Sequence, residues 1–271
     1  MKTLLLAGLI AGANTLALAS AALTESTFTE IIHEAKVVAA SDKTAVPART
    51  GMVFHAPDKV RTGMASRVEM TAPDKTITRI GANTVFTFET GGRNIALEAG
   101  SLLFHSPAGA GGGTIHYRGT AAAVLGTTMI CAVLSDGRFK VLDLEGKVKV
   151  TLKKGRSIFL KAGQMVIVTP DGDEFEDIKN FNLGKLVSHL VLVTGFSDPL
   201  SSLPLIQAAI DEQNHDIANG TPDPPVSDDE AGFGVDTRDH DHFGPVLPPE
   251  TPDHTMLHVS PVKPKKHPPK P

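Results

Sequence analysis

The chain has 271 residues, a formal net charge of −4 and ordinary proportions of apolar and charged residues. This length can bury one sizeable core, and the charge provides no general attraction to nucleic acid or to anionic membranes. With no Trp and a single Tyr, a surface that stacks sugars or bases on aromatic rings is also disfavoured.

Residues 1–22 predict a secretory signal peptide. Lys2 precedes an apolar run, and small residues follow around Ala17–Ala21. No later apolar run reaches the roughly 20 residues that a membrane-spanning helix needs. We therefore expect a periplasmic or secreted bacterial protein with no transmembrane segment in the mature chain.

Residues 23–46 predict an N-terminal helix and a linker. Thr27 and Glu30 have the spacing of a capping box. The residues that follow the cap recur at helical spacing, namely Phe28, Ile31, Ile32 and Ala35. We expect this helix to pack on the domain that follows.

Residues 47–172 predict an antiparallel β-domain. Apolar and polar residues alternate over 67–70, 86–89 and 147–152, which is typical of half-buried strands. The run Met165–Val168 has no polar face and should be buried on both sides. Cys131, the only cysteine, lies in another apolar run and is expected to be a buried free thiol.

Glycines recur in this region every 17 to 20 residues on either side of the glycine-rich stretch 107–114, at Gly63, Gly81, Gly100, Gly126, Gly146 and Gly163. Such a period suits one hairpin or one solenoid coil per unit. We interpret each glycine as a corner between two short strands, because a residue without Cβ allows a positive φ and a close backbone approach. Both a β-solenoid-like arrangement and a two-sheet sandwich fit this pattern.

Residues 173–220 predict a helical extension. Ser202 can cap a helix that has Pro204 in its first turn and ends at Asn219–Gly220. One apolar stripe should dock this helix on the β-domain, made of Leu203, Ile206, Ile210 and Ile217. Residues 221–271 contain 12 of the 19 prolines and several acidic clusters. This composition predicts a disordered tail rich in Pro, Asp and His.

The sequence contains no recognisable catalytic motif. It has no G-x-S-x-G elbow, and no lysine follows the glycine-rich loop 109–113 as a phosphate cradle requires. The carboxylates at strand ends are expected to be solvated charges and not an acid–base pair, namely Asp74, Glu89, Glu98 and Glu145. We predict a protein that is not an enzyme, with no catalytic residues and no cofactor.

Imidazole groups are the one candidate for metal chemistry. The tail holds Asp239–His242 and three further histidines, His254, His258 and His267. Imidazoles and carboxylates at alternate positions can bind Zn²⁺ or Cu²⁺ weakly. A folded site also needs supporting hydrogen bonds, so we assign no metal ligands.

Six elements in order carry a family resemblance: Arg61-Thr62-Gly63 with Ser66-Arg67, Ile80-Gly81 with Asn83-Thr84, Leu97 with Gly100, Gly126-Thr127-Thr128, Leu144-Glu145-Gly146, and Ala162-Gly163-Gln164. Over roughly residues 60–170 the chain resembles the FecR domain. The resemblance implies a β-rich, non-catalytic domain on the outer side of the cytoplasmic membrane. Members of the best-known type sense an outer-membrane iron-siderophore transporter and signal to a sigma factor.

The chain shows no sigma-regulating segment before this domain, so we do not expect it to carry a signal across a membrane alone. The first functional hypothesis is a scaffold or sensor module that binds another envelope protein, with the tail as a contact arm. The alternative is a sensor of a small ligand or a metal, such as an iron chelate, zinc or copper. The oligomeric state and the partner are not predicted.

Overall fold

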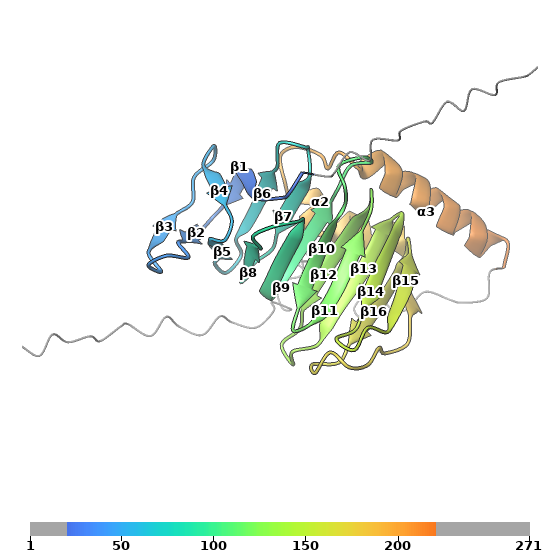
Figure 1. The fold of residues 1–271 in the computed structure, drawn as a ribbon. Helices are drawn as coiled ribbons and strands as arrows, with labels where there is room; N and C mark the ends of the chain where they lie inside the picture. The colour runs from blue at the N-terminus through green and yellow to red at the C-terminus, as the bar shows by residue number, and fades with distance from the viewer. Residues whose placement is uncertain (1–20, 221–271) are drawn as a thin grey trace, which may run out of the picture.

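Two open β-sheets stacked face to face form the body of the protein (Figure 1). The structure is a computed structural model and describes residues 21–220. In spatial order, sheet A contains β4 (Val53–His55), β1 (Glu25–Ile32), β6 (Arg67–Thr71), β7 (Ile77–Ile80), the second half of β9 (Asn94–His105), β12 (Thr128–Val133), β13 (Phe139–Glu145), β16 (Gln164–Val168) and β17 (Lys179–Asn180).

Sheet B has the same design and is joined to sheet A through β9. In spatial order it contains β3 (Ala45–Pro47), β2 (Ala35–Val38), β5 (Lys59–Thr62), β8 (Val85–Phe88), the first half of β9, β10 (Gly113–Tyr117), β11 (Thr120–Val124), β14 (Lys147–Thr151) and β15 (Ser157–Lys161). All neighbouring strands are antiparallel except β9 and β10, which are parallel. The mainly β fold class predicted from the sequence is confirmed.

The recurring glycines lie where the chain crosses from one sheet to the other, as predicted. Gly100 divides β9, whose first half pairs in sheet B and whose second half pairs in sheet A. Its φ is +79°, and the corner glycines at 126, 146 and 163 also have positive φ. The glycines at 63 and 81 lie at equivalent crossings without positive φ. Each unit is therefore a bent pair of strands, and the stack combines a sandwich cross-section with a solenoid-like repeat.

Threonine hydroxyls complete these corners. Thr84 Oγ1 accepts a hydrogen bond from the N–H of Ser101 over 3.0 Å, directly beside the Cβ-free Gly100. In the neighbouring unit, Thr62 Oγ1 donates to the carbonyl of Gly81 and accepts from the N–H of Thr84. These contacts give the threonines of the family motifs a structural role, since they satisfy buried backbone groups that leave the ladder at each bend.

The predicted N-terminal helix is wrong, because residues 25–32 form strand β1 and residues 35–38 form β2. β1 lies between β4 and β6 and buries Phe28 in the aromatic cluster between the sheets. The β-branched Thr27, Thr29 and Ile31 favour this extended form. Long-range pairing on both sides of the strand thus outweighs a local capping-box pattern.

Three helices cover the outer face of sheet A, the face turned away from sheet B. They are α1 (Leu183–His189), α2 (Val191–Thr194) and α3 (Leu203–Ala218). Their apolar side chains join a second core with sheet A residues such as Ile130, Leu142 and Met165. Sheet A is therefore buried on both faces, which explains why Met165–Val168 is wholly apolar, as predicted.

The predicted helix at 203–218 is confirmed, but two details of its docking are wrong. Of the predicted stripe, only Ile206 is fully buried, whereas Leu203 and Ile217 are exposed. Ser202 occupies the N-cap position without a capping hydrogen bond, because its hydroxyl instead meets Thr128 on sheet A. The helix is thus anchored near its start by Ile206 and Ser202, and again further along by Gln213, which accepts from the N–H of Leu183 and donates to the carbonyl of Phe181.

No helix within residues 21–220 is long and apolar enough to cross a membrane. The predicted cleavable leader falls almost wholly outside this range, and the tail at 221–271 falls outside it altogether.

Gly100→Ala should destabilise the protein by about 3 kcal/mol, because the new methyl group adds left-handed backbone strain and a collision. The Cβ would clash with Thr84 Oγ1 and lie 2.5 Å from Thr84 Cα. Urea unfolding of the purified protein measures the loss. Gly155→Ala is the matched control, since Gly155 has φ +90° but no atom within 4 Å of its added Cβ. Equal losses in both variants would contradict the corner role of Gly100.

Candidate functional site

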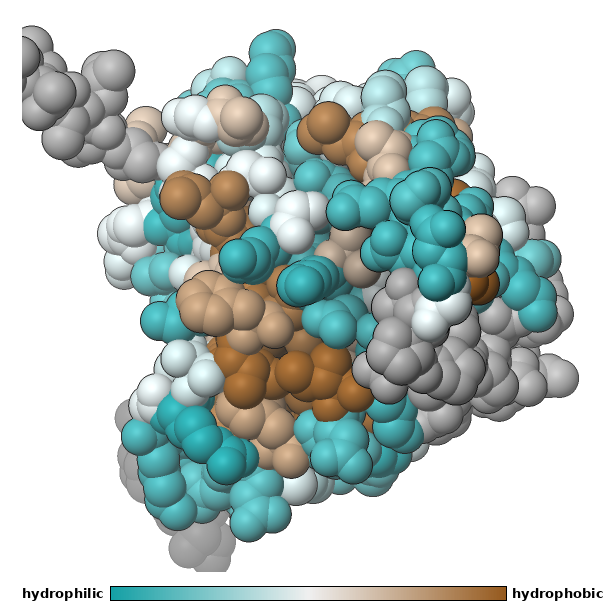
Figure 2. Space-filling model, turned by 90° about the vertical axis from the view of Figure 1, so that its right-hand side faces the viewer, coloured by the Kyte–Doolittle hydropathy of each residue, from teal (hydrophilic) through white to brown (hydrophobic). Residues whose placement is uncertain are grey.

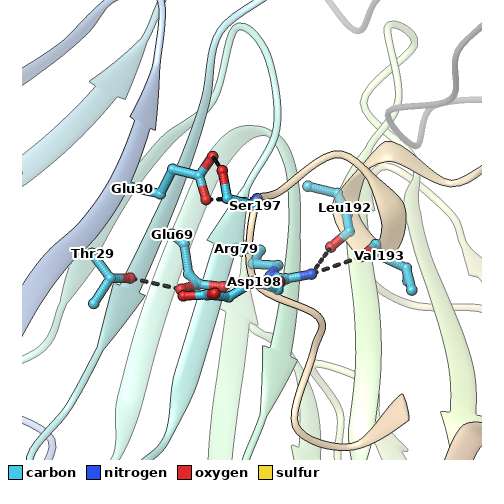
Figure 3. A network of polar contacts seen from close by, with 8 residues as sticks. All are labelled: Thr29, Glu30, Glu69, Arg79, Leu192, Val193, Ser197 and Asp198. Carbon is cyan, nitrogen blue, oxygen red and sulfur yellow. Dashed lines mark hydrogen bonds and ion pairs between the residues drawn. The ribbon is translucent and has the colours of Figure 1, made fainter.

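Arg79 is the most deeply buried cation among the described residues, and it joins sheet A to the C-terminal segment (Figure 3). Its side chain has no exposed surface and pairs with Glu69 at 2.7 Å on the adjacent strand. The guanidinium also donates to the carbonyls of Leu192, Val193 and Asp198. Two of these carbonyls belong to the last turn of α2, where backbone acceptors lack partners within the helix.

Further contacts hold the same segment in place. Thr29 donates to Glu69 Oε1 at 2.7 Å, and the Phe196 ring lies 4.4 Å from the Arg79 guanidinium carbon. On β1, Glu30 accepts hydrogen bonds from the N–H and the hydroxyl of Ser197. All donors and acceptors in this network face other protein groups, so we assign it to anchoring of residues 190–198 and not to ligand binding.

Arg79→Met should lower the free energy of unfolding by about 3–5 kcal/mol, since it leaves Glu69 buried without its cation. It should also speed proteolytic cleavage within residues 190–200. Urea unfolding and timed proteolysis provide the two measurements.

Arg138→Met is the control for this variant, because Arg138 forms half-exposed ion pairs with Asp136 and Glu176. Its cost should stay below about 1 kcal/mol. If both arginine variants cost the same, Arg79 does not anchor the segment.

A second buried polar cluster lies beneath the start of α3. Thr128 Oγ1 is 2.9 Å from His105 Nδ1, 2.7 Å from Glu145 Oε1 and 2.7 Å from Ser202 Oγ. Burial lowers the pKa of His105 and raises the pKa of Glu145. The expectation that Glu145 is a solvated charge is wrong, since the bulge between Thr128 and Met129 places it among these buried groups.

The residue types of this cluster resemble a hydrolase triad, but their arrangement differs. A serine nucleophile needs a base within hydrogen-bond reach, whereas here Thr128 stands between Ser202 and His105. All four side chains are buried under α3. The cluster therefore anchors the helix start, and Thr128 belongs to the family motif that marks this position.

Two more ionisable groups are buried on β13. Burial and the nearby Glu145 raise the pKa of Asp143 to about 8, although the backbone N–H groups of Glu145 and Val148 act to lower it. Burial lowers the pKa of Lys140 to about 7. A pKa this far above the ordinary 3.8 keeps the Asp143 carboxyl largely protonated at neutral pH.

Asp143→Asn should stabilise the protein, and the gain in the free energy of unfolding should increase as pH rises from about 4 to about 8. The pKa of Asp143 is about 8 in the folded chain against an ordinary 3.8, so the folded state keeps a proton that the unfolded state releases in this window. Stability of the natural protein thus falls as pH rises to about 8 and then levels, while the Asn side chain cannot ionise. The advantage of the variant should grow by at least about 1 kcal/mol across the window.

Urea unfolding at several pH values measures this difference. The exposed Asp136 provides the control. Desolvation acts to raise the pKa of its carboxyl, but the hydrogen bonds and the ion pair with Arg138 together outweigh it and lower the pKa, so Asp136 stays ionised throughout the window. Asp136→Asn should therefore shift stability by a constant amount. A constant shift for Asp143→Asn would contradict the buried proton.

The other residues considered in the sequence analysis form no reaction site within residues 21–220. Burial raises the pKa of Cys131, which lies in the core as predicted. Asp74 pairs with Arg93, and Glu98 pairs with Lys59. Within residues 21–220 no group of three His, Cys, Asp or Glu side chains is arranged to hold a metal ion. The candidate histidines from His240 to His267 lie outside the described residues.

The outer face of sheet B is the broad surface that no described element covers. On its central strands the outward residues are small or polar and half-buried, namely Ala96, Thr114, His116, Ala121 and Ala123. Beyond them lies a cationic margin that we call the lysine face, made of Lys147, Lys149 and Lys161 around the exposed Phe159.

Like charges meet on the lysine face. Lys147 lies directly opposite Lys161 in the β14–β15 register, and Lys149 lies opposite Phe159. Lys147 Nζ is 5.6 Å from the centre of the Phe159 ring. Directly opposed like charges disfavour strand pairing, and a 57% exposed Phe is unfavourable in water. Both features suit contact with an anionic, partly apolar partner.

The end of the molecule formed by β15 and β16 also exposes apolar surface. Figure 2 looks onto this end and shows apolar side chains gathered between polar margins. Here Ile178 and Phe159 are exposed, and Ile158 and Phe175 are half-buried. The lysine face therefore continues into an apolar end of the sandwich.

Part of the chain is similar to known proteins. Residues 58–149 match the family model described as FecR protein. Two crystal structures of a protein assigned as an anti-sigma factor from Parabacteroides distasonis, at 1.65 Å and 2.50 Å resolution, share 23% and 22% identity with this chain and give TM-scores of 0.40 and 0.39. Each match covers 45% of this chain and 59% of the other. No curated protein matched. The match at residues 58–149 falls within the stretch for which the sequence motifs indicated a resemblance to this family.

Proposed function

We propose that this protein is a non-catalytic FecR-like module of the cell envelope, acting as a scaffold or sensor in regulation by binding another protein. The FecR domain supports a regulatory role. The leader-like composition of residues 1–22 supports a periplasmic or secreted location. The contact surface is the outer face of sheet B, including the lysine face.

The choice of the contact surface rests on which faces of the two sheets are buried. The inner faces of both sheets form the first core, and the helices bury the outer face of sheet A in the second. The outer face of sheet B is the large regular surface left bare by residues 21–220. An uncovered sheet face can seat a partner surface. The marginal lysines would steer an anionic partner towards it, and the exposed Phe159 offers an aromatic anchor.

Paired charge reversal, Lys147→Glu with Lys149→Glu, should reduce recovery of the partner about tenfold, because like-charge contacts across an interface cost several kcal/mol. The measurement is crosslinking of the tagged mature protein in its native envelope, with mass spectrometry of the attached proteins. Recovery of an outer-membrane transporter or a membrane sigma regulator would favour a sensing pathway.

Lys75→Glu is the matched control, since Lys75 is an exposed lysine in the turn between β6 and β7. The amount of partner recovered with this variant should equal the amount recovered with the natural protein. Undiminished recovery with the paired reversal would exclude the outer face of sheet B as the contact surface.

A further inference from the structure

The folded body includes residues that precede the first strand. Leu23 is 2% exposed and lies in the core between the two sheets. Its N–H donates to the carbonyl of Gly92 over 2.8 Å, and the carbonyl of Thr24 accepts from the N–H of Ala56 over 2.8 Å. The segment 21–24 is therefore part of the fold, and it fills the core beside the turn between β8 and β9.

Arg93, the last residue of that turn, holds the segment at Ala21. The Arg93 side chain is 7% exposed. Its Nε donates to the carbonyl of Gly112 and its Nη2 donates to the hydroxyl of Thr76, each over 2.6 Å. Its Nη1 pairs with Asp74 at 2.6 Å and donates to the carbonyl of Ala21 over 3.1 Å. Each nitrogen of this buried guanidinium thus has an acceptor, and the Ala21 carbonyl is one of them.

The leader-like region offers two overlapping cleavage sites close to this contact. They are the triplets Ala17-Leu18-Ala19 and Ala19-Ser20-Ala21, both with small residues at the positions that leader cleavage requires. Cleavage after Ala19 keeps the Ala21 carbonyl in the mature chain, whereas cleavage after Ala21 removes it. The two cuts therefore give mature chains that differ at the Arg93 site.

Cleavage after Ala21 would disturb the Arg93 site in two ways. The buried guanidinium would lose an acceptor. The new α-ammonium, on Ala22, would lie within about 5.7 Å of Arg93 Nη1 if the backbone stays in place, because its nitrogen is bonded to the Ala21 carbonyl carbon before the cut. Asp74 would then face two cations that repel each other. Cleavage one residue later would place the ammonium on the buried Leu23, which is also unfavourable.

We infer that the leader is removed between Ala19 and Ser20, and that Arg93 then binds the start of the mature chain through the Ala21 carbonyl. The leader thus ends at residue 19 and not at residue 22. This processing site rests on the export that the proposed function assumes. It involves neither the outer face of sheet B nor the partner that this face binds.

The first measurement is the intact mass of the protein, carrying a C-terminal tag and recovered from its native envelope, with sequencing of its first residues. A chain that begins at Ser20 is expected. A chain that begins at Ala22 or Leu23 would overturn the inference and leave the proposed function intact. A chain that retains Met1 would overturn the inference and also the periplasmic or secreted location within the proposed function.

The second measurement compares the thermal unfolding of two purified chains, residues 20–271 and residues 22–271, each with a free amino terminus. At about pH 6 the shorter chain should have a melting temperature about 5 °C lower. This deficit should shrink above about pH 9, where the α-amine is mostly neutral. Arg93→Met should remove most of the deficit, because both effects of the cut act on its guanidinium.

Arg156→Met is the matched control, since Arg156 is an exposed arginine in the turn between β14 and β15, over the ring of Phe175. It should leave the difference between the two chains unchanged. Equal melting temperatures for the two chains with the natural Arg93 would contradict a binding site at Ala21. A deficit that does not change with pH would remove the repulsion between the ammonium and the guanidinium from the argument.

Discussion

The fold depends on the bend that each strand unit makes between the two sheets. At a bend the chain leaves one hydrogen-bonded ladder and enters another, so some backbone groups lose their partners inside the core. The structure solves this with a glycine that lets neighbouring backbones touch and a threonine hydroxyl that bonds the stranded groups, as Thr84 does beside Gly100. The same pair recurs where Thr127 meets Gly146.

The C-terminal segment depends on a different solution. Covering sheet A with short helices brings helix ends, and their unpartnered carbonyls, against an apolar surface. Arg79 supplies several donors from one planar group, and Glu69 balances its charge within the sheet. The ion pair thus makes it possible to bury the outer face of sheet A, whereas no described element covers the outer face of sheet B.

The sequence predicted the features that are local and periodic. The β-domain, the corner glycines and the helix at 203–218 follow from spacing, because each glycine and each apolar stripe acts within its own unit. β1 could not be predicted, since its form depends on β4 and β6, which are far along the chain. The buried positions of Arg79 and Glu145 were also missed, because a charged side chain within a strand usually signals a solvated face. For Arg79, its register opposite Glu69 was the available signal.

The parallel pairing of β10 with β9 interrupts an otherwise regular alternation. The bent units before it and after it each contribute one strand to either sheet, whereas β10 contributes to sheet B alone. The protein thus consists of two short stacks joined at a seam, and sheet B is one strand wider there. Units that contact only their neighbours can be added or lost at the ends of a stack with little effect elsewhere. Addition or loss of a whole bent unit at either end of a stack would therefore leave the seam in place.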